Sequence, residues 1–372
     1  MHVCFLINQL APGGAPTLLL DIVQQTDADD IDYTVCFIEG DDDLVPDFRH
    51  AGARVVDFGA AFKFDPRALA RMARFFAQEE FDILHTNLPY AQTLGRVFGR
   101  LGGQTVISTQ HSVAEHYHPI TGLLERLTRP LDARTVAISA GVERSFTGAA
   151  HGYEPGMDGK WCTIYNGIDV SGFNERVRNA DITALTANYG IDDGPVFVSV
   201  GRYVPAKSQY DLIMAMESVL TTYPDAQLLL VGWGKCEDDL RAAVHERGLA
   251  ANVTLTGRVP PADIHCHYAL ADAFVIASQM EGLGIAGLEA MAAELPVVAT
   301  TVPGLREIVG DGETGLLVPP NDPDALADAM VAVLQADGYG RRGYERAAEI
   351  FDIRTTAAAY RSLYSELTDY HD

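Results

Sequence analysis

Two glutamates flank a glycine-bearing loop in the segment ASQMEGLGIAGLEAM, residues 277–291. An apolar strand pattern leads into the loop, and a helix pattern opens around Ile285, directly after Gly284. The free N–H groups and the positive dipole end of such a helix favour a phosphate group. Glu281 lies on the loop and Glu289 lies about one turn inside the helix. We expect the two carboxylates to bracket a diphosphate, with Glu289 near a ribose and Glu281 near a sugar.

A second glycine turn carries two cations five residues apart, in the segment Gly201-Arg202-Tyr-Val-Pro-Ala-Lys207. It also follows an apolar strand pattern. A diphosphate leaving group gains negative charge as its bond to a sugar breaks, so cations fixed nearby lower the barrier. Arginine can bind two oxygens at once, whereas lysine acts as a point charge. Arg202 and Lys207 are therefore candidates for stabilising such a leaving group.

The elements that must position these residues follow a βαβ pattern. Short apolar runs alternate with helix patterns along the whole chain, which predicts parallel sheets in an α/β fold with two Rossmann-like, doubly wound domains. The first domain should contain seven strands and the second five. A turn signal, Asn-Gly, in Tyr165-Asn-Gly-Ile-Asp169 marks the join. The predicted domains are 1–168 and 169–352, and residues 353–372 should form a helix that returns to the first domain.

The composition fits a protein of the cell interior. Hydrophobic residues make up 48% of the 372 residues, enough for two cores, and the five cysteines are scattered without a CxxC pair. The net charge is −24, and only four of the 27 basic residues are lysines, a composition that resembles halophilic cytosolic proteins. Such a charge argues against nucleic acid as a partner. With no signal-peptide pattern and no apolar stretch near about 20 residues, we predict a cytoplasmic protein, at most bound to the cytoplasmic face of a membrane.

These blocks together resemble glycosyltransferase family 4. The resemblance rests on the Glu281-x7-Glu289 pair, on Gly201-Arg202…Lys207 and on Tyr165-Asn-Gly-Ile-Asp169. Further matches extend it over most of the chain: Gly257-Arg258-Val259, Gly312-Glu-Thr-Gly315-Leu-Leu-Val-Pro319, Gly13-Gly14 and Ser108-Thr-Gln-His111. The resemblance implies a GT-B fold, a nucleotide-diphosphate sugar as donor in an interdomain cleft, no metal or other cofactor, and retention of the anomeric configuration.

The resemblance also implies roles for single residues. Glu281 would contact hydroxyls of the donor sugar, Glu289 the ribose, and His111 would lie near the reacting sugar. Arg202 and Lys207 would bind the pyrophosphate. The remaining donor-binding residues would be Gly13 and Gly14, whose backbone approaches the phosphates from the first domain, and Gly201, Arg258, Val259, Gly284 and Ile285 in the second. The acceptor would be a glycan, a lipid-linked or a small molecule. The chain departs from the family at Asn87, Glu294 and Pro303-Gly304, which bears on acceptor and sugar geometry.

Three other motifs have a structural and a functional interpretation. Asp41-Asp-Asp43 and His265-Cys-His267 could suggest metal binding, but a solvated loop and a structural role are favoured. Asp65-Pro66 should start a helix in which three arginines share one stripe while Leu69, Met72, Ala73 and Phe76 occupy the other side. We hypothesise that the face formed by Arg67, Arg71 and Arg74 meets anionic lipid or a phosphate-bearing acceptor. The alternative is an ordinary amphipathic helix packed on its sheet.

Other activities remain open at the level of the sequence. A nucleotide-sugar epimerase would convert the donor without an acceptor, and a sugar phosphorylase would need a cofactor-binding lysine site that is not recognisable here. A dinucleotide-dependent oxidoreductase is disfavoured because no G-x-G-x-x-G follows the first strand. A non-catalytic nucleotide-sugar-binding protein would not need the complete set of two glutamates and two cations.

Overall fold

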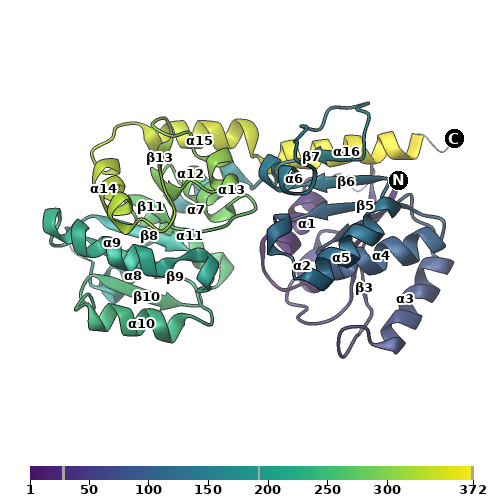
Figure 1. Cartoon of the computed structure of the whole chain (residues 1–372), viewed down its shortest axis with the longest axis horizontal. Coiled ribbons are helices and arrows are strands. Elements are labelled where there is room, and N and C mark those ends of the chain that lie inside the picture. The colour runs from purple at the N-terminus through teal and green to yellow at the C-terminus, as the bar shows by residue number, and fades with distance from the viewer. Residues whose placement is uncertain (27–29, 192, 370–372) are drawn as a thin grey trace. The chain divides into compact units, whose positions relative to one another are not determined.

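The computed structural model describes residues 1–26, 30–191 and 193–369 (Figure 1). The chain divides into two compact units. Unit 1 comprises Met1–Gly167 together with Ile353–Asp372, and unit 2 comprises Ile168–Asp352. The chain passes from unit 1 to unit 2 after Gly167 and returns to unit 1 at Ile353, so the last helix belongs to unit 1.

Within the described residues, unit 1 contains one sheet of seven parallel strands in the order β3-β2-β1-β4-β5-β6-β7. The strands are β1 (His2–Ile7), β2 (Asp32–Phe37), β3 (Arg54–Asp57), β4 (Ile83–Asn87), β5 (Thr105–Gln110), β6 (Arg134–Ala137) and β7 (Trp161–Thr163). The chain first adds strands on one side of β1 and then continues on the other side at β4. The strand order therefore reverses between β1 and β4, the point where ligands bind in open α/β sheets.

The helices of unit 1 connect these strands. They are α1 (Gly14–Gln24), α2 (Val45–His50), α3 (Pro66–Gln78), α4 (Pro89–Leu101), α5 (Pro119–Thr128), α6 (Ala140–Thr147) and α16 (Ile353–Asp369), with 3-10 turns η1 (Ala114–His116) and η2 (Arg129–Leu131). Helix α3 begins as predicted, because the Asp65 carboxylate accepts a hydrogen bond from the Arg67 N–H at 2.9 Å and Pro66 occupies the first helical position.

Helix α16 is tied to unit 1 by a buried polar cluster as well as by apolar packing. The Tyr364 hydroxyl lies 2.7 Å from Nδ1 of His85, and the other ring nitrogen of His85 lies 2.7 Å from the Thr109 hydroxyl. Tyr360 reaches the same threonine at 3.0 Å. Burial lowers the pKa of His85 to about 3, so the ring is neutral and can bond both partners. The prediction of a C-terminal helix that returns to the first domain is confirmed.

Unit 2, over residues 168–191 and 193–352, contains a sheet of six parallel strands in the order β10-β9-β8-β11-β12-β13. The strands are β8 (Val196–Val200), β9 (Gln227–Val231), β10 (Val253–Gly257), β11 (Ala273–Ile276), β12 (Val297–Thr300) and β13 (Gly315–Val318). The helices are α7 (Val170–Arg178), α8 (Thr183–Tyr189), α9 (Gln209–Thr222), α10 (Glu237–Glu246), α11 (Ile264–Ala269), α12 (Ile285–Ala292), α13 (Pro303–Ile308), α14 (Pro323–Val333) and α15 (Tyr339–Ile350), with 3-10 turns η3 (Pro205–Lys207) and η4 (Pro261–Asp263). The strand order reverses between β8 and β11.

The prediction of two doubly wound α/β domains is confirmed, with one strand missed. Strand β13 pairs with β12 over four residues at the edge of the sheet. It begins at Gly315, and glycine is depleted in strands, so the segment resembled a loop motif. The Gly315 position needs glycine because a Cβ there would overlap the carbonyl oxygen of Val297 on β12. The glycine that concealed the strand in the sequence is therefore what allows it to pair.

Candidate functional site

The two segments that we expect to bind the diphosphate meet at the carboxyl edge of the unit 2 sheet. The Gly201–Lys207 segment follows β8, and the loop with Glu281 follows β11. These strands are neighbours, and both run in the same direction. Ligands of open α/β sheets bind at this edge where the strand order reverses. The topology thus brings together two segments that are about 75 residues apart in the sequence.

An ion pair between Lys207 and Glu281 connects the two segments. The Lys207 Nζ contacts Oε1 of Glu281, and the Ser278 hydroxyl donates to the same oxygen at 3.0 Å. The backbone N–H of Gln279 also donates to the carbonyl of Ala206 at 2.9 Å. The lysine side chain is 24% exposed and the glutamate side chain 12%, so water screens this pair less than an ordinary surface pair. A phosphate that approaches Lys207 must share the lysine with Glu281.

Arg202 is an exposed cation held on a rigid segment. Among the described residues, none forms an ion pair or a hydrogen bond with its guanidinium group. The segment itself is anchored by Tyr203, which is buried and donates its hydroxyl to the carbonyl of Leu230 at 2.6 Å. The amide of Gln209 donates to the Arg202 carbonyl at 2.9 Å. Arg202 is therefore available to an anionic ligand while its backbone is fixed.

Two glycines after β9 hold this segment in place. A Cβ at Gly232 would overlap the carbonyl oxygen of Gly201, and a Cβ at Gly234 would lie 2.5 Å from the carbonyl oxygen of Tyr203. Their φ angles of 152° and 156° are also unfavourable for other residues. The sequence analysis missed both residues, although a Gly-Trp-Gly run directly after a strand was a usable signal.

The N-terminus of α12 faces the same edge without a side-chain cap from any described residue. The first residue outside the helix, Gly284, has a φ of 97°, and a Cβ there would lie 2.5 Å from Leu305 on α13. A Cβ at Gly304 would lie 2.8 Å from the carbonyl oxygen of Glu281. Helix α13 thus packs directly on the loop and fixes it. The first N–H groups of α12, beginning at Ile285, remain suitable for binding an anion.

Glu289 lies one turn inside α12 in a partly buried position. The Tyr268 hydroxyl is 2.7 Å from Oε2 of Glu289. Burial raises the pKa of Glu289 to about 7, and the hydrogen bond from Tyr268 opposes this shift only in part. Without a ligand, the carboxyl group therefore changes its charge near neutral pH. Hydroxyl groups of a ligand that donate to the carboxylate would favour the charged form.

Arg258 and Val259 follow β10, two strands away from β8. The Arg258 guanidinium lies 5.5 Å from the centre of the Trp233 ring, a cation–π distance. Trp233 follows β9 and is about half exposed. The two residues form an exposed planar surface at the same edge of the sheet as Arg202. Trp233 is the third residue that the sequence analysis missed.

In unit 1, His111 lies at the carboxyl end of β5 beside Asn87 at the end of β4. Nε2 of His111 is 2.9 Å from Oδ1 of Asn87, whose amide nitrogen is directed at the carbonyl of His85 at 3.4 Å. Burial lowers the pKa of His111 to about 4. Because an amide oxygen only accepts, this amide orientation assigns the proton of neutral His111 to Nε2 and leaves Nδ1 as an acceptor.

Gly13 and Gly14 follow β1 in the same unit and have no packing reason to be glycine. A Cβ at Gly13 would come no closer than 4.0 Å to the carbonyl of Ala11, and a Cβ at Gly14 would meet no described atom within 4 Å. Neither residue has a φ in the left-handed region. Gly13, Gly14 and His111 thus belong to unit 1, and the other predicted site residues belong to unit 2.

The sequence analysis favoured a solvated loop for Asp41-Asp-Asp43 and a structural role for His265-Cys-His267. Asp41–Asp43 are exposed, and Nε2 of His267 lies 3.0 Å from the hydroxyl of Tyr189. Among the described residues, no group of three or more histidine, cysteine, aspartate or glutamate side chains could hold a metal ion.

One detail of the predicted α3 helix was wrong. Ala73 is exposed rather than packed, and the buried side chains are Ala68, Met72 and Phe76.

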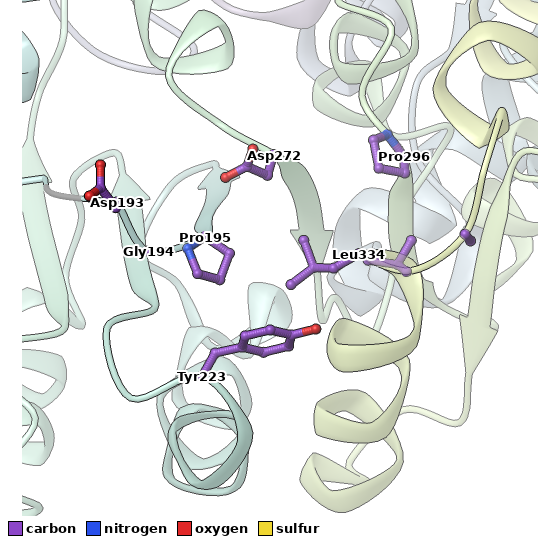
Figure 2. A pocket seen from close by; sticks show the side chains of 9 residues that line it. Asp193, Gly194, Pro195, Tyr223, Asp272, Pro296 and Leu334 are labelled. Atoms are coloured by element: carbon purple, nitrogen blue, oxygen red, sulfur yellow. The ribbon is translucent and has the colours of Figure 1, made fainter.

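A pocket of about 480 Å³ lies at the opposite, amino-terminal edge of the unit 2 sheet (Figure 2). Pro195 precedes β8, Asp272 precedes β11 and Pro296 precedes β12. The Asp272 carboxylate already accepts the backbone N–H of Val196 at 2.8 Å. Since ligands of parallel sheets bind at the carboxyl ends of the strands, this pocket is not part of the candidate site.

The family model described as Glycosyltransferase Family 4 matches residues 12–171, and the model described as Glycosyl transferases group 1 matches residues 181–349. A GDP-mannose-dependent alpha-(1-6)-phosphatidylinositol monomannoside mannosyltransferase from Mycolicibacterium smegmatis is 29% identical over 316 residues, which cover 81% of each chain. The protein of the same name from Mycobacterium tuberculosis is 31% identical over 298 residues, covering 77% of this chain and 75% of that protein.

Among solved structures, Anabaena Alr3699/HepE in complex with UDP has a TM-score of 0.82 at 22% identity, and the match covers 98% of this chain and 100% of that chain. The same protein has been solved in complex with UDP-glucose. Within the part of this chain that the structure describes, no helix has the length and apolarity needed to cross a bilayer.

Proposed function

We propose that this chain, which belongs to glycosyltransferase family 4, transfers a hexose from a nucleoside-diphosphate sugar to a lipid-linked acceptor with retention of configuration. The chain has the GT-B fold. The named donor and acceptor of its relatives, GDP-mannose and a phosphatidylinositol mannoside, support a lipid acceptor and make GDP-mannose the first donor to test. The UDP complexes of the structural neighbour support a nucleotide donor in general.

The observation that carries the proposal is the group of Arg202, Lys207 and the uncapped α12 N-terminus at one sheet edge. In the proposed reaction, the bond between the sugar C1 and the diphosphate oxygen breaks, and the acceptor oxygen bonds to C1 from the same face. The acceptor proton passes to the departing phosphate oxygen. The two cations and the Ile285 amide would neutralise the charge that develops on the diphosphate.

The other residues would orient the donor. Glu289 would accept hydrogen bonds from the ribose, Glu281 would accept them from hydroxyls of the sugar, and Arg258 with Val259 would lie beside the nucleotide. We further propose that His111 acts near the reacting sugar as a neutral hydrogen-bonding group, with Asn87 fixing its orientation. Gly13 and Gly14 would allow close approach of the donor phosphates to the backbone. The exposed arginines of α3, Arg67, Arg71 and Arg74, would contribute to contact with the lipid phase.

A transfer assay tests this proposal. The chain is incubated with labelled GDP-mannose, and in parallel with UDP-glucose, in low and high KCl and with or without phosphatidylinositol vesicles. We expect labelled lipid only when both donor and vesicles are present, in equal amount with and without EDTA, and with the anomeric configuration of the donor. Conversion of the donor without an acceptor would favour an epimerase, and tight donor binding without turnover would favour a binding protein.

Glu289 predicts a specific pH dependence of donor binding. If only the carboxylate form accepts the ribose hydroxyls, a pKa of about 7 leaves roughly one tenth of the sites competent at pH 6 and nearly all at pH 8. The dissociation constant for GDP or UDP, measured by calorimetry, should therefore rise about tenfold from pH 8 to pH 6. Glu289→Gln should bind more weakly but lose this component of the pH dependence. Since the phosphates titrate equally in both proteins, parallel pH curves would contradict the role of Glu289.

Gly14→Ala separates a ligand requirement from a folding requirement. A Cβ at this position meets no described atom, and alanine is favoured over glycine within a helix by up to about 1 kcal/mol. The melting temperature should therefore stay unchanged or rise slightly. If a donor phosphate approaches this backbone, kcat/KM should fall on the order of tenfold, which is about 1.4 kcal/mol. An unchanged kcat/KM would remove Gly14 from the donor-binding set.

A further inference from the structure

Three helices of unit 1 form one layer on its sheet. Helix α4 packs on β1, β4 and β5, with α3 on one side and α5 on the other (Figure 1). The exposed side chains of α3, α4 and α5 therefore form one continuous outer surface, here called the α3–α5 surface. Its composition differs from that of the rest of the chain.

Helix α5 presents its apolar stripe to the outside. Its one buried residue is Glu125, whose carboxylate lies 3.6 Å from the Arg96 guanidinium in the interior. The large apolar side chains Ile120, Leu123 and Leu127 follow a spacing of three and four residues, so they share one face of the helix. They are 64%, 56% and 65% exposed. A globular helix normally buries such a stripe and exposes its charges, so the α5 pattern is inverted.

Helix α4 extends the apolar area with Val97 and with Leu101, which is 80% exposed. The three helices also carry basic side chains. The exposed ones on the three helices are Arg67, Arg71, Arg74, Arg100 and Arg126. The three helices contain a single acidic residue, Glu125, and it is buried, although the chain as a whole contains 51 acidic and 27 basic residues. The α3–α5 surface is thus apolar and basic in an acidic protein.

We propose that the α3–α5 surface docks on an anionic lipid surface, with the apolar stripe of α5 as its anchor. Leucine and isoleucine side chains can enter the boundary between headgroups and acyl chains, while arginines pair with lipid phosphates. The charge argues against a second copy of this chain as the occupant. Two copies that paired through this surface would bring together five exposed arginines from each copy, with no exposed acidic residue on the three helices to compensate.

This inference goes beyond the proposed transfer reaction and does not depend on it, because docking requires neither donor nor turnover. It also places the main membrane contact on α4 and α5, whereas the sequence analysis placed it on the arginines of α3. The arginines of α3 supply charge, but Arg71 also donates through Nε to the carbonyl of Phe58 at 2.8 Å, and α3 buries its own apolar residues in the core. Among the three helices, the exposed large apolar side chains are on α4 and α5.

Co-sedimentation with vesicles tests the docking surface. The full chain is mixed with vesicles of phosphatidylglycerol and phosphatidylcholine, or of phosphatidylcholine alone. We expect binding to the anionic vesicles that weakens as KCl increases. Replacing the stripe with serine, as Ile120→Ser/Leu123→Ser/Leu127→Ser, should lower the partition coefficient at least about tenfold, because three apolar side chains no longer enter the membrane. The triple change Arg67→Gln/Arg71→Gln/Arg74→Gln should have a smaller effect.

Two controls keep the result interpretable. Tyr210→Ser changes a similarly exposed aromatic residue of unit 2 and should leave binding unchanged. The melting temperature of the serine variant should match that of the original chain, since the replaced side chains are exposed. Absence of binding to anionic vesicles, or equal binding by the serine variant, would overturn the proposal. A dimer in light scattering that the serine variant abolishes, without vesicle binding, would instead identify a second copy as the occupant and would also overturn it.

Discussion

Replacing either cation of the candidate site, as Arg202→Ala or Lys207→Ala, should lower kcat about 100-fold or more. Each cation would bind the diphosphate more strongly as its charge increases toward the transition state, so its loss raises the barrier rather than only weakening binding. The effect of Arg202→Ala should not include the loss of an ion pair within the protein, because no described side chain pairs with the Arg202 guanidinium. Steady-state kinetics with saturating donor separate the effect on kcat from that on KM.

The control for these variants is an ion pair of similar type outside the site. Arg341 and Glu345 form an exposed pair on α15, with Nε 3.0 Å from Oε1. Arg341→Ala should leave kcat within about twofold, because an isolated exposed pair contributes little. A kcat close to that of the unchanged chain in Arg202→Ala or in Lys207→Ala would refute the assignment of that cation to the leaving group.

Glu281→Gln should have the second-largest effect, lowering kcat/KM on the order of 100-fold. Glutamine keeps the size of the side chain but accepts weaker hydrogen bonds from sugar hydroxyls, and it removes the negative charge beside Lys207. Because the two side chains are in contact, their effects should not be additive. The double variant Lys207→Ala/Glu281→Gln should lose less activity than the product of the two single losses.

The same cycle on the exposed pair, with Arg341→Ala and Glu345→Gln, provides the matched reference, where we expect additive and near-neutral effects. Full additivity for Lys207 and Glu281 would mean that their contact does not matter during the reaction. An unchanged kcat/KM in Glu281→Gln would remove Glu281 from the donor-sugar contacts.

Much of the fold could be predicted from the sequence because its signals are local. Strand β8 at Val196–Val200 and strand β11 at Ala273–Ile276 coincide with the apolar strand patterns that precede the two glycine turns, since each is a short apolar run bounded by turn or loop residues. The glycine turns after these strands placed Arg202 and Glu281 on loops. Topology then explains why the loops are neighbours, because a doubly wound sheet reverses its strand order between β8 and β11.

Features that depend on contacts between distant segments could not be predicted. The requirement for glycine at position 232 comes from the carbonyl of Gly201, and the raised pKa of Glu289 depends on its burial in the folded protein beside Tyr268. The contact of His111 with Asn87 crosses two strands. Likewise, the outward stripe of α5 resembles any amphipathic helix in the sequence, and only the buried position of Glu125 shows that the helix is inverted. The catalytic and binding roles of the site residues stay predictions.

A crystal of the chain soaked with GDP or UDP tests the central assignment most directly. The expected result is electron density for the diphosphate in contact with the Arg202 guanidinium, the Lys207 ammonium group and the backbone N–H of Ile285, with the ribose at Glu289. Density for the nucleotide at the amino-terminal edge of the sheet, beside Tyr223 and Asp272, with no ligand at these four residues, would contradict the assignment.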